Sequence, residues 1–287
     1  MPGGEWDGSG SDPLGKAVLR RLLEHPKFEV LPLKNVLDQV GHLPEGSTVS
    51  VTASPTKTLE DTVNLAGDLR LRGFDVIPHL SARMTHDKTH LAALLDRLAG
   101  LRISRVFVVG GDAPQRGIFP DGHSLLLAMD DLGHELTEIG VPSYPEGHAV
   151  IPDSNLRQAL HDKQPYASYM TTQMCFDARA IVDFVAECRV DGVSLPVQIG
   201  IPGVADRLKL LQISTRIGVG QSMRFLAKHR GLVSRFVRPG GDAPEELLEG
   251  LGSGVSYPGI GIVGVHIYTF NQCETTERWR QEYLETL

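Results

Sequence analysis

A single carboxylate, Glu29, interrupts an apolar stretch near the start of the chain, "KFEVLPLK" (residues 27–34). The stretch is predicted to be a buried strand bounded by proline. Burial disfavours the charged form of a carboxyl group and raises its pKa. A glutamate in such a strand therefore calls for a reason, and Glu29 is a candidate functional residue.

A second carboxylate, Asp112, follows two glycines at the end of another apolar run, "VFVVGGDAP" (106–114). Glycine lets the backbone approach a flat ligand closely, and an aspartate beyond it can accept hydrogen bonds from the edge of that ligand. A tight turn in which Asp112 caps the next segment fits these letters equally well.

Two other segments match known sequence motifs, but they lack the secondary structure or the ligands that those motifs require. "GIGIVG" (259–264) has the dinucleotide-binding spacing, yet it leads into a predicted strand where that motif requires a helix. "HDKTH" (86–90) has two histidines at the spacing of zinc proteases, but it has Asp in place of Glu and no evident third ligand. We interpret it as the first turn of a helix, and we predict no metal site.

The candidate residues need elements that position them, and the chain alternates apolar, β-branched runs with amphipathic helical stretches. The eight predicted strands cover 27–32, 47–53, 74–79, 104–110, 138–145, 168–175, 193–200 and 261–269. The predicted helices cover 57–72, 87–101, 124–136, 176–188 and 205–229, and 203–259 as a whole is assigned to an extended seventh helical layer. Eight βα units in 287 residues predict a (β/α)8 TIM barrel in preference to an open doubly wound sheet. An extra helix is expected over "PLGKAVLRRLLEH" (13–25), before the first strand.

In a TIM barrel the active site lies at the carboxyl ends of the strands. Seven polar residues fall within or just beyond the predicted strands, namely Glu29, Thr52, His79, Asp112, Tyr144, Gln173 and Tyr268. A single such residue is more often a satisfied polar group than a functional one. Seven at one rim indicate a site.

Composition narrows the class of protein. The net charge is -7, and no basic block interleaved with aromatics appears, so a nucleic-acid partner is not expected. Three widely spaced cysteines indicate reduced thiols in a cytoplasmic protein. No apolar run is long enough to span a membrane, and no obligate protein partner is evident. We expect residues 1–12 to be a disordered leader and 13–287 a single barrel domain.

Seven motifs, in order along the chain, resemble those of the methylenetetrahydrofolate reductase family, whose fold is a TIM barrel. The likeness runs from about Phe28 to Asn271. The pairs are "FEVLP" with F-E-F-F-P, "VSVTASP" with V-S-V-T-Y-G, "IPHLSAR" with P-H-L-T-C, "VVGGDAP" with L-R-G-D-x-P, "YPEGHAV" with Y-P-E-x-H-P-E, "TTQMCFDA" with I-T-Q-F-F-F-D, and "HIYTFN" with H-F-Y-T-L-N.

The resemblance implies reduction of methylenetetrahydrofolate to methyltetrahydrofolate with NAD(P)H. Glu29 would be the general acid that protonates the bridging nitrogen and opens the five-membered ring, so that hydride can attack the iminium carbon. A carboxylic acid protonated near neutral pH suits that role, and burial at an apolar barrel mouth would raise the pKa of Glu29. The resemblance further implies that Asp112, Gln173 and Tyr268 contact the folate. The positions that match the family's flavin site are Thr52, His79, Gly111, Tyr144 and His148.

Three departures from the family pattern concern charge. Gly110 stands where the family has arginine, Gln272 stands where arginine often follows Y-T-L-N, and the basic pair before T-Q is replaced by the surroundings of Lys163, with His161 and Asp162 beside it. The changes at Gly110 and at the basic pair remove cations expected near flavin phosphates, and Gln272 alters the family's contact to the far part of the folate. Two cofactor arrangements stay open: FAD bound through a rearranged phosphate site, or hydride transferred directly from NAD(P)H to the folate.

Two functions of other classes also stay open. A barrel with this mouth could be a tetrahydrofolate-dependent methyltransferase, which would not oxidise NAD(P)H, or a non-catalytic folate-binding subunit. Retention of Glu29 argues against the second, because binding alone needs no acid for ring opening.

Overall fold

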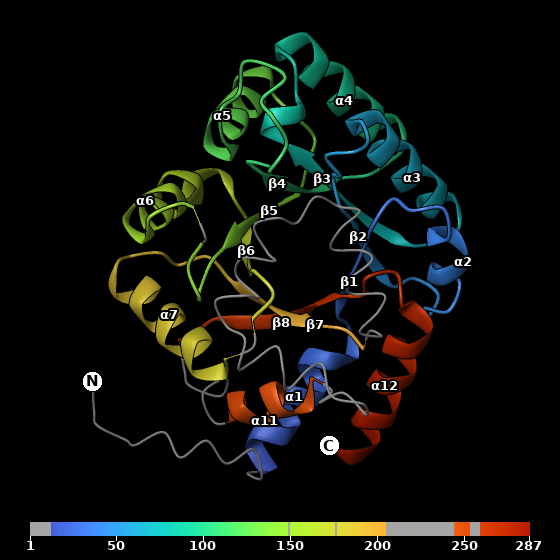
Figure 1. Ribbon diagram of the computed structural model, residues 1–287, viewed down its shortest axis with the longest axis vertical. Helices are drawn as coiled ribbons and strands as arrows, with labels where there is room; N and C mark the ends of the chain where they lie inside the picture. Colours follow the sequence, from blue (N-terminus) through green and yellow to red (C-terminus); the bar gives the residue numbers. More distant parts are fainter. Residues whose placement is uncertain (1–12, 149, 176, 205–243, 253–258) are drawn as a thin grey trace.

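The chain folds into a closed barrel of eight parallel strands that are paired in sequence order, β1 to β8 (Figure 1). The computed structural model describes residues 13–148, 150–175, 177–204, 244–252 and 259–287. The strands are Lys27–Val30 (β1), Thr48–Val51 (β2), Asp75–Ser81 (β3), Arg105–Val109 (β4), Glu138–Ser143 (β5), Tyr169–Thr172 (β6), Val197–Pro202 (β7) and Ile262–Tyr268 (β8). The barrel closes because β8 pairs with β1. The predicted TIM barrel is confirmed.

Helices surround the barrel on the outside (Figure 1). They are Pro13–Glu24 (α1), Val36–Val40 (α2), Leu59–Leu71 (α3), Lys88–Gly100 (α4), Gly122–Leu132 (α5), Asp153–Lys163 (α6), Ala178–Val190 (α7), Glu245–Leu251 (α11) and Cys273–Thr286 (α12), with short 3-10 turns at Ala82–Met84 (η1) and Gln164–Tyr166 (η2). The expected extra helix before the first strand is confirmed as α1, which packs against β8 and α12. Among the described residues no helix is both long and apolar enough to cross a membrane.

Local sequence signals set where several of these helices begin. The Thr58 hydroxyl accepts a hydrogen bond from the Asp61 N–H, and the Asp61 carboxylate accepts one from the Thr58 N–H, so α3 starts with a reciprocal capping box. Asp87 caps α4 by accepting from the His90 N–H. "HDKTH" is therefore a helix start, as predicted from its letters.

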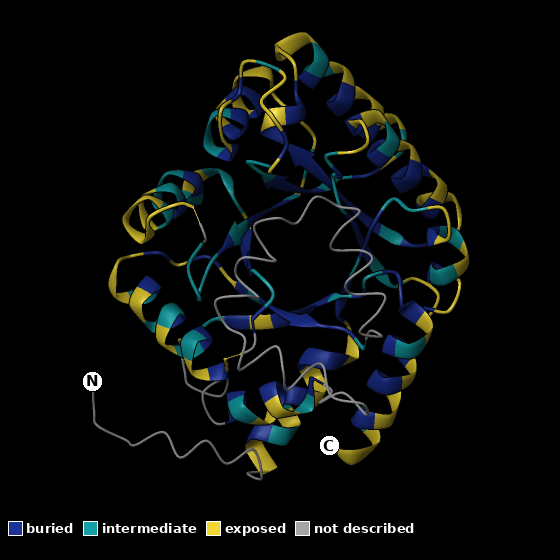
Figure 2. Cartoon of the chain, viewed as in Figure 1, coloured by how far each residue is buried: buried dark blue, intermediate teal, exposed yellow. Residues whose placement is uncertain are grey.

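Side chains alternate across each strand, so one set faces the helices and the other faces the barrel interior. The outward set and the helices' inner faces form the main core, which includes Val30, Val49 and Leu80. Figure 2 shows this as buried strands ringed by helices whose outer faces are exposed. Inside the barrel, Ile77, Phe107 and Tyr169 form a separate apolar cluster.

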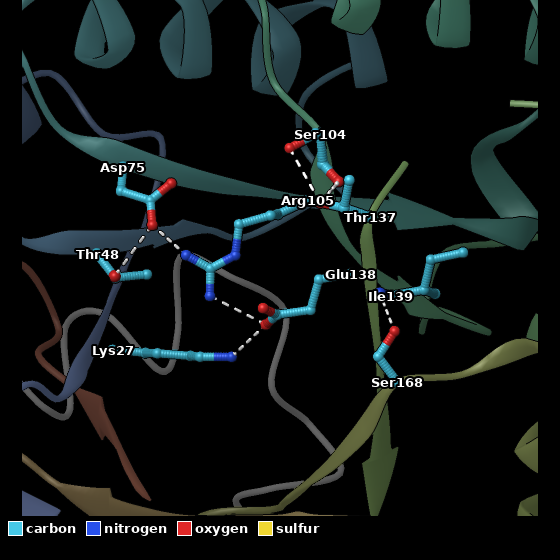
Figure 3. A network of polar contacts seen from close by, with 9 residues as sticks. All are labelled: Lys27, Thr48, Asp75, Ser104, Arg105, Thr137, Glu138, Ile139 and Ser168. Atoms are coloured by element: carbon cyan, nitrogen blue, oxygen red, sulfur yellow. Dashed lines mark hydrogen bonds and ion pairs between the residues drawn. The ribbon is translucent and has the colours of Figure 1, made fainter. Parts of the chain in front are cut away.

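Below that cluster, charged side chains close the amino-terminal end of the barrel (Figure 3). Each comes from the first residue of its strand. The Lys27 ammonium lies 2.8 Å from Glu138 Oε1, Arg105 Nη2 lies 3.0 Å from the same oxygen, and Arg105 also pairs with Asp75. Burial lowers the pKa of Lys27 to about 8, against the opposing effect of Glu138. The amino-terminal end of a TIM barrel contributes to stability, and this network joins four strands.

The seventh strand differs from the prediction of 193–200. It begins at Val197, because the guanidinium of Arg189 donates hydrogen bonds to the carbonyls of Val193 (2.7 Å) and Leu195 (2.9 Å). Those carbonyls are therefore used by a side chain in place of a strand partner. The sequence analysis gave no residue ranges for the helices α2, α6 and α12. The leader expected over 1–12 and the helix expected over 205–229 lie outside the described residues.

Candidate functional site

Three side chains from β1, β3 and β8 converge inside the barrel near its carboxyl-terminal mouth. Glu29 Oε2 lies 3.0 Å from His266 Nε2 and 3.6 Å from His79 Nε2. His79 Nε2 is also 2.8 Å from the hydroxyl oxygen of Ser50 on β2. Strand pairing produces this arrangement, because Glu29 is level with Ser50 on one side and with Tyr268 on the other. We refer to Glu29, His79 and His266 as the mouth cluster.

The pKa of Glu29 corrects a prediction made from the sequence. Burial acts to raise it, but the hydrogen bond from His266 and the nearby His79 imidazole act in the opposite direction, and the resulting pKa lies below the ordinary value for glutamate. The prediction of a raised pKa assumed an apolar barrel mouth. The structure places two imidazoles there, so the free protein stabilises the carboxylate.

The end of β1 is held firmly at this point. Thr52 Oγ1 donates to the Val30 carbonyl (3.0 Å), and Thr269 Oγ1 donates to the Glu29 carbonyl (2.6 Å). Asn271 clamps the next residue from both sides, because its side-chain oxygen accepts from the Leu31 N–H and its amide donates to the Leu31 carbonyl. These bonds fix where the Glu29 side chain emerges, and they give Thr52 a role beside the catalytic candidate.

Tyr268 and Gln173 lie at the ends of β8 and β6. The Tyr268 hydroxyl donates to the Thr172 carbonyl (3.1 Å), and its ring centroid lies 5.0 Å from that of His266. Its pKa is raised well above the ordinary value by burial and then by the charge of Glu29. Gln173 is partly buried, and its backbone N–H donates to the Ser143 carbonyl (2.7 Å). Within the described residues its side-chain amide has no hydrogen bond, so it is available to a ligand.

Asp112 is exposed and does not cap the following helix, because the N-cap of α5 is Asp121. The alternative in which Asp112 is a capping residue is thereby removed for that helix. Gly111, beside it, has a φ of 91°, and a Cβ there would lie 2.1 Å from Ser81 Oγ. No other residue fits this turn without strain. Burial, with the charge of Asp112, raises the pKa of Tyr144 to about 12. Asp112 and Tyr144 line one cavity.

A cavity of about 380 Å³ lies beside Asp112, between the strand ends of β4 and β5 and the helices α5 and α6. Its lining includes Gly110, Gly111, Asp112, Gly122, Tyr144, His148 and Lys163. The Nδ1 of His148 accepts hydrogen bonds from the N–H groups of Val150 and Ile151 (3.2 Å each), and its ring meets Tyr144 edge to face. A larger cavity of about 580 Å³ between α6 and α7 shares Tyr144 and His148.

Lys163, which lies in the segment that replaces the family's basic pair, is a cation in this region. It is buried, it lines the smaller cavity, and its ammonium makes no hydrogen bond or ion pair with another described residue. Burial lowers its pKa to about 8, opposed by the charges of Asp121 and Asp162. A free ammonium at the wall of a cavity suits an anionic group of a ligand.

The predicted residues thus fall into two neighbouring groups, both at the carboxyl ends of the strands. Glu29, Thr52, His79 and Tyr268 surround the mouth, and Gly111, Asp112, Tyr144 and His148 line the cavity. Across the described ranges no cluster of three or more His, Cys, Asp or Glu side chains could hold a metal ion.

Sequence reasoning missed His266, Ser50 and Lys163 as candidate residues. A signal for His266 was present, because it precedes Tyr268 by two positions on one strand and so faces the same side. Ser50 likewise precedes Thr52 by two positions. Lys163 was noted only as part of the segment that replaces the family's basic pair, and its place at the end of a helix gave no sign of the cavity.

Fold and site together define a (β/α)8-barrel protein with a carboxylate–imidazole cluster at the end where such barrels carry their active sites. A family model described as "Methylenetetrahydrofolate reductase" matches residues 25–221. The chain belongs to that family.

Individual relatives are distant. A Caenorhabditis elegans protein named "Probable methylenetetrahydrofolate reductase (NADPH)" is 24% identical over 196 residues, which cover 62% of this chain and 29% of the relative. The chain thus matches less than a third of that protein's length. A solved structure from Burkholderia cenocepacia J2315, described as a "putative lyase/mutase", aligns with a TM-score of 0.47 and 12% identity over 96% of this chain and 86% of the other. That TM-score is too low to inform function.

Proposed function

We propose that the protein reduces methylenetetrahydrofolate to methyltetrahydrofolate with NAD(P)H, and that Glu29 supplies the proton. The observation that carries this proposal is the placement of Glu29 at the barrel mouth, 3.0 Å from His266, with its side chain 14% exposed. Membership of the family supports the choice of substrate. Three free, buried cysteines fit a cytoplasmic enzyme.

In the proposed reaction Glu29 protonates the bridging nitrogen of the folate, the bond from that nitrogen to the methylene carbon breaks, and hydride adds to the resulting iminium carbon. A carboxylate that is ionised in the free protein must first take up a proton. A pterin over the mouth would cover the exposed part of Glu29 and strengthen the desolvation that already acts to raise its pKa. Folate binding should therefore be accompanied by proton uptake.

Asp112 and Gln173 are proposed to orient the pterin. The exposed carboxylate of Asp112 can accept hydrogen bonds from the pterin's amino group and ring N–H, and the Gln173 amide can both donate and accept. Tyr268 is proposed to contact the folate from β8, with its hydroxyl already held by Thr172.

The cavity beside Asp112 is proposed to receive the cofactor. Its residues fit a dinucleotide: Lys163 offers a cation to the diphosphate, and Gly111 allows the close approach of a flat ring. Tyr144 and His148 line the same cavity, and Thr52 and His79, at the neighbouring mouth, are also proposed to contact the nicotinamide or flavin. FAD in this site would supply a ring that relays hydride, and NAD(P)H would supply hydride directly.

An absorbance spectrum and two rate assays test the proposal. NAD(P)H oxidation should occur with methylenetetrahydrofolate and also with the artificial acceptor menadione, and the spectrum shows whether flavin accompanies the activity. A protein that binds methylenetetrahydrofolate but oxidises no NAD(P)H with either acceptor would overturn the proposal in favour of a binding protein or a methyltransferase.

A further inference from the structure

The mouth cluster rests on an aromatic ring that comes from a different strand. Phe107 on β4 lies level with His79 on β3, and their ring centroids are 4.8 Å apart. The same ring is stacked on His266 at 6.4 Å, with an interplanar angle of 29°. One phenyl ring therefore contacts both imidazoles that surround the Glu29 carboxylate.

The Phe107 ring is itself confined by its neighbours. Gly140 on β5 leaves the space for it, because a Cβ there would lie 2.5 Å from Phe107 Cδ2 and 2.4 Å from Tyr169 Cζ. Tyr169 lies 6.3 Å from Phe107 between ring centroids, and Ile77 completes this apolar cluster. Phe107 is 6% exposed, so it has little freedom to move.

Beneath this cluster lies the charged network at the amino-terminal end, which is shown in Figure 3. The Lys27 ammonium sits 3.5 Å from the centroid of the Tyr169 ring and 2.8 Å from Glu138. The barrel interior is thus layered: charged residues at the bottom, an aromatic layer in the middle, and the mouth cluster at the top. Phe107 and Tyr169 separate the two charged layers.

We propose that Phe107 is a positioning residue for proton transfer, which holds the His79 and His266 rings against Glu29 and closes the barrel to water from below. This inference rests on the proposed function, in which Glu29 donates the proton. Phe107 is not expected to touch substrate, because the imidazoles and Glu29 lie between it and the mouth. Its effect should act on proton transfer and on the ionisation of His79.

His79 reports on this role directly. The groups that face it are Glu29 from β1, Ser50 from β2 and His266 from β8, with Phe107 packed against its ring. Burial lowers the pKa of His79 to about 4, with Glu29 acting to raise it and His266 to lower it. Water admitted beside the ring should reduce the desolvation and move this pKa back toward the ordinary value for histidine, about 6.5.

The test compares Phe107→Ala with Ile77→Ala, which removes apolar volume from the same cluster but no ring from the imidazoles. Histidine side chains are titrated by NMR in both variants, and the His79 signal is assigned by its absence in His79→Gln. In Phe107→Ala the midpoint of His79 should rise by at least about one pH unit, while Ile77→Ala leaves it in place. Phe107→Leu, which keeps most of the volume, should give an intermediate shift and serves if the alanine variant does not fold.

Kinetics provide the second readout. In Phe107→Ala the kcat for folate reduction should fall roughly tenfold or more, with KM for the folate and the menadione rate changed less than about threefold. If the titration midpoint of His79 were the same in Phe107→Ala and Ile77→Ala, the positioning role would be overturned, because both substitutions would then act only through lost packing. The titration needs no turnover, so it decides the role of Phe107 even if the wild type proves unable to reduce folate.

Discussion

Replacing Glu29 with Gln tests the proposed acid with little change in shape. Glutamine can still accept the hydrogen bond from His266, which lies 3.0 Å from the carboxylate, but it cannot release a proton to the folate. Folate reduction should fall by about 10² to 10⁴, which corresponds to roughly 3 to 5 kcal/mol of transition-state stabilisation. Oxidation of NAD(P)H by menadione needs no ring opening and should persist.

The same variant has a signature in pH. Because the pKa of Glu29 is lowered in the folded protein, its carboxylate stabilises the fold above the unfolded pKa, about 4.3, and that contribution is lost as pH falls through the lower folded pKa. Glu29→Gln should lack this part of the acid unfolding curve. It should also abolish the proton uptake expected on folate binding, measured with an indicator dye in weak buffer.

A matched control is available on the surface. Glu60 Oε1 lies 2.9 Å from His90 Nε2, so Glu60→Gln also alters a glutamate–histidine pair, but on helices outside the barrel. Glu60→Gln should leave both reactions unchanged. If Glu29→Gln retained folate reduction near the wild-type rate, Glu29 would not be the acid, and the methyltransferase and binding-protein functions would again be open.

Three further changes probe other parts of the structure. Asp112→Asn replaces acceptors with a donor that faces pterin donors, so calorimetry should show folate binding weakened by roughly 1.5 to 3 kcal/mol with NAD(P)H affinity little changed; equal losses would indicate a structural role. Lys163→Gln should weaken NAD(P)H or FAD binding about tenfold and reduce its salt dependence, whereas an unchanged constant would remove Lys163 from the cofactor site. In the wild type the buried Lys27 ammonium, with its pKa of about 8, should deprotonate at a lower pH than lysine in the unfolded chain. The free energy of unfolding should therefore rise between pH 8 and 10, by up to about 3 kcal/mol. Lys27→Met should remove this rise. Denaturant curves that run parallel for the two proteins over that range would contradict it.

The barrel could be predicted from the sequence because its signals are local. Apolar strands and amphipathic helices alternate, and that alternation alone indicates parallel pairing. The seventh strand was misplaced for a reason that is not local: Arg189, from the preceding helix, binds carbonyls that looked available for pairing. A short apolar run does not show whether its carbonyls are already used.

The placement of the candidate residues at the carboxyl ends of the strands could be predicted from the sequence, but the electrostatics around them could not. Glu29 and His266 are 237 positions apart, and each faces inward by simple alternation. Only the pairing of β8 with β1 makes them neighbours, and that contact reverses the expected direction of the Glu29 pKa shift. That Lys163 lines a cavity could not be predicted either, because the cavity forms only when α5 and α6 pack beside the ends of β4 and β5.

Transfer of deuterium from NAD(P)H labelled at the nicotinamide C4 tests the central claim most directly. The label is followed by mass spectrometry of the folate product after one turnover with methylenetetrahydrofolate. We expect methyltetrahydrofolate to form, with deuterium in the methyl group if transfer is direct and with the label lost to solvent if a flavin relays the hydride. Absence of methyltetrahydrofolate from a protein that binds both ligands would contradict the proposed reduction.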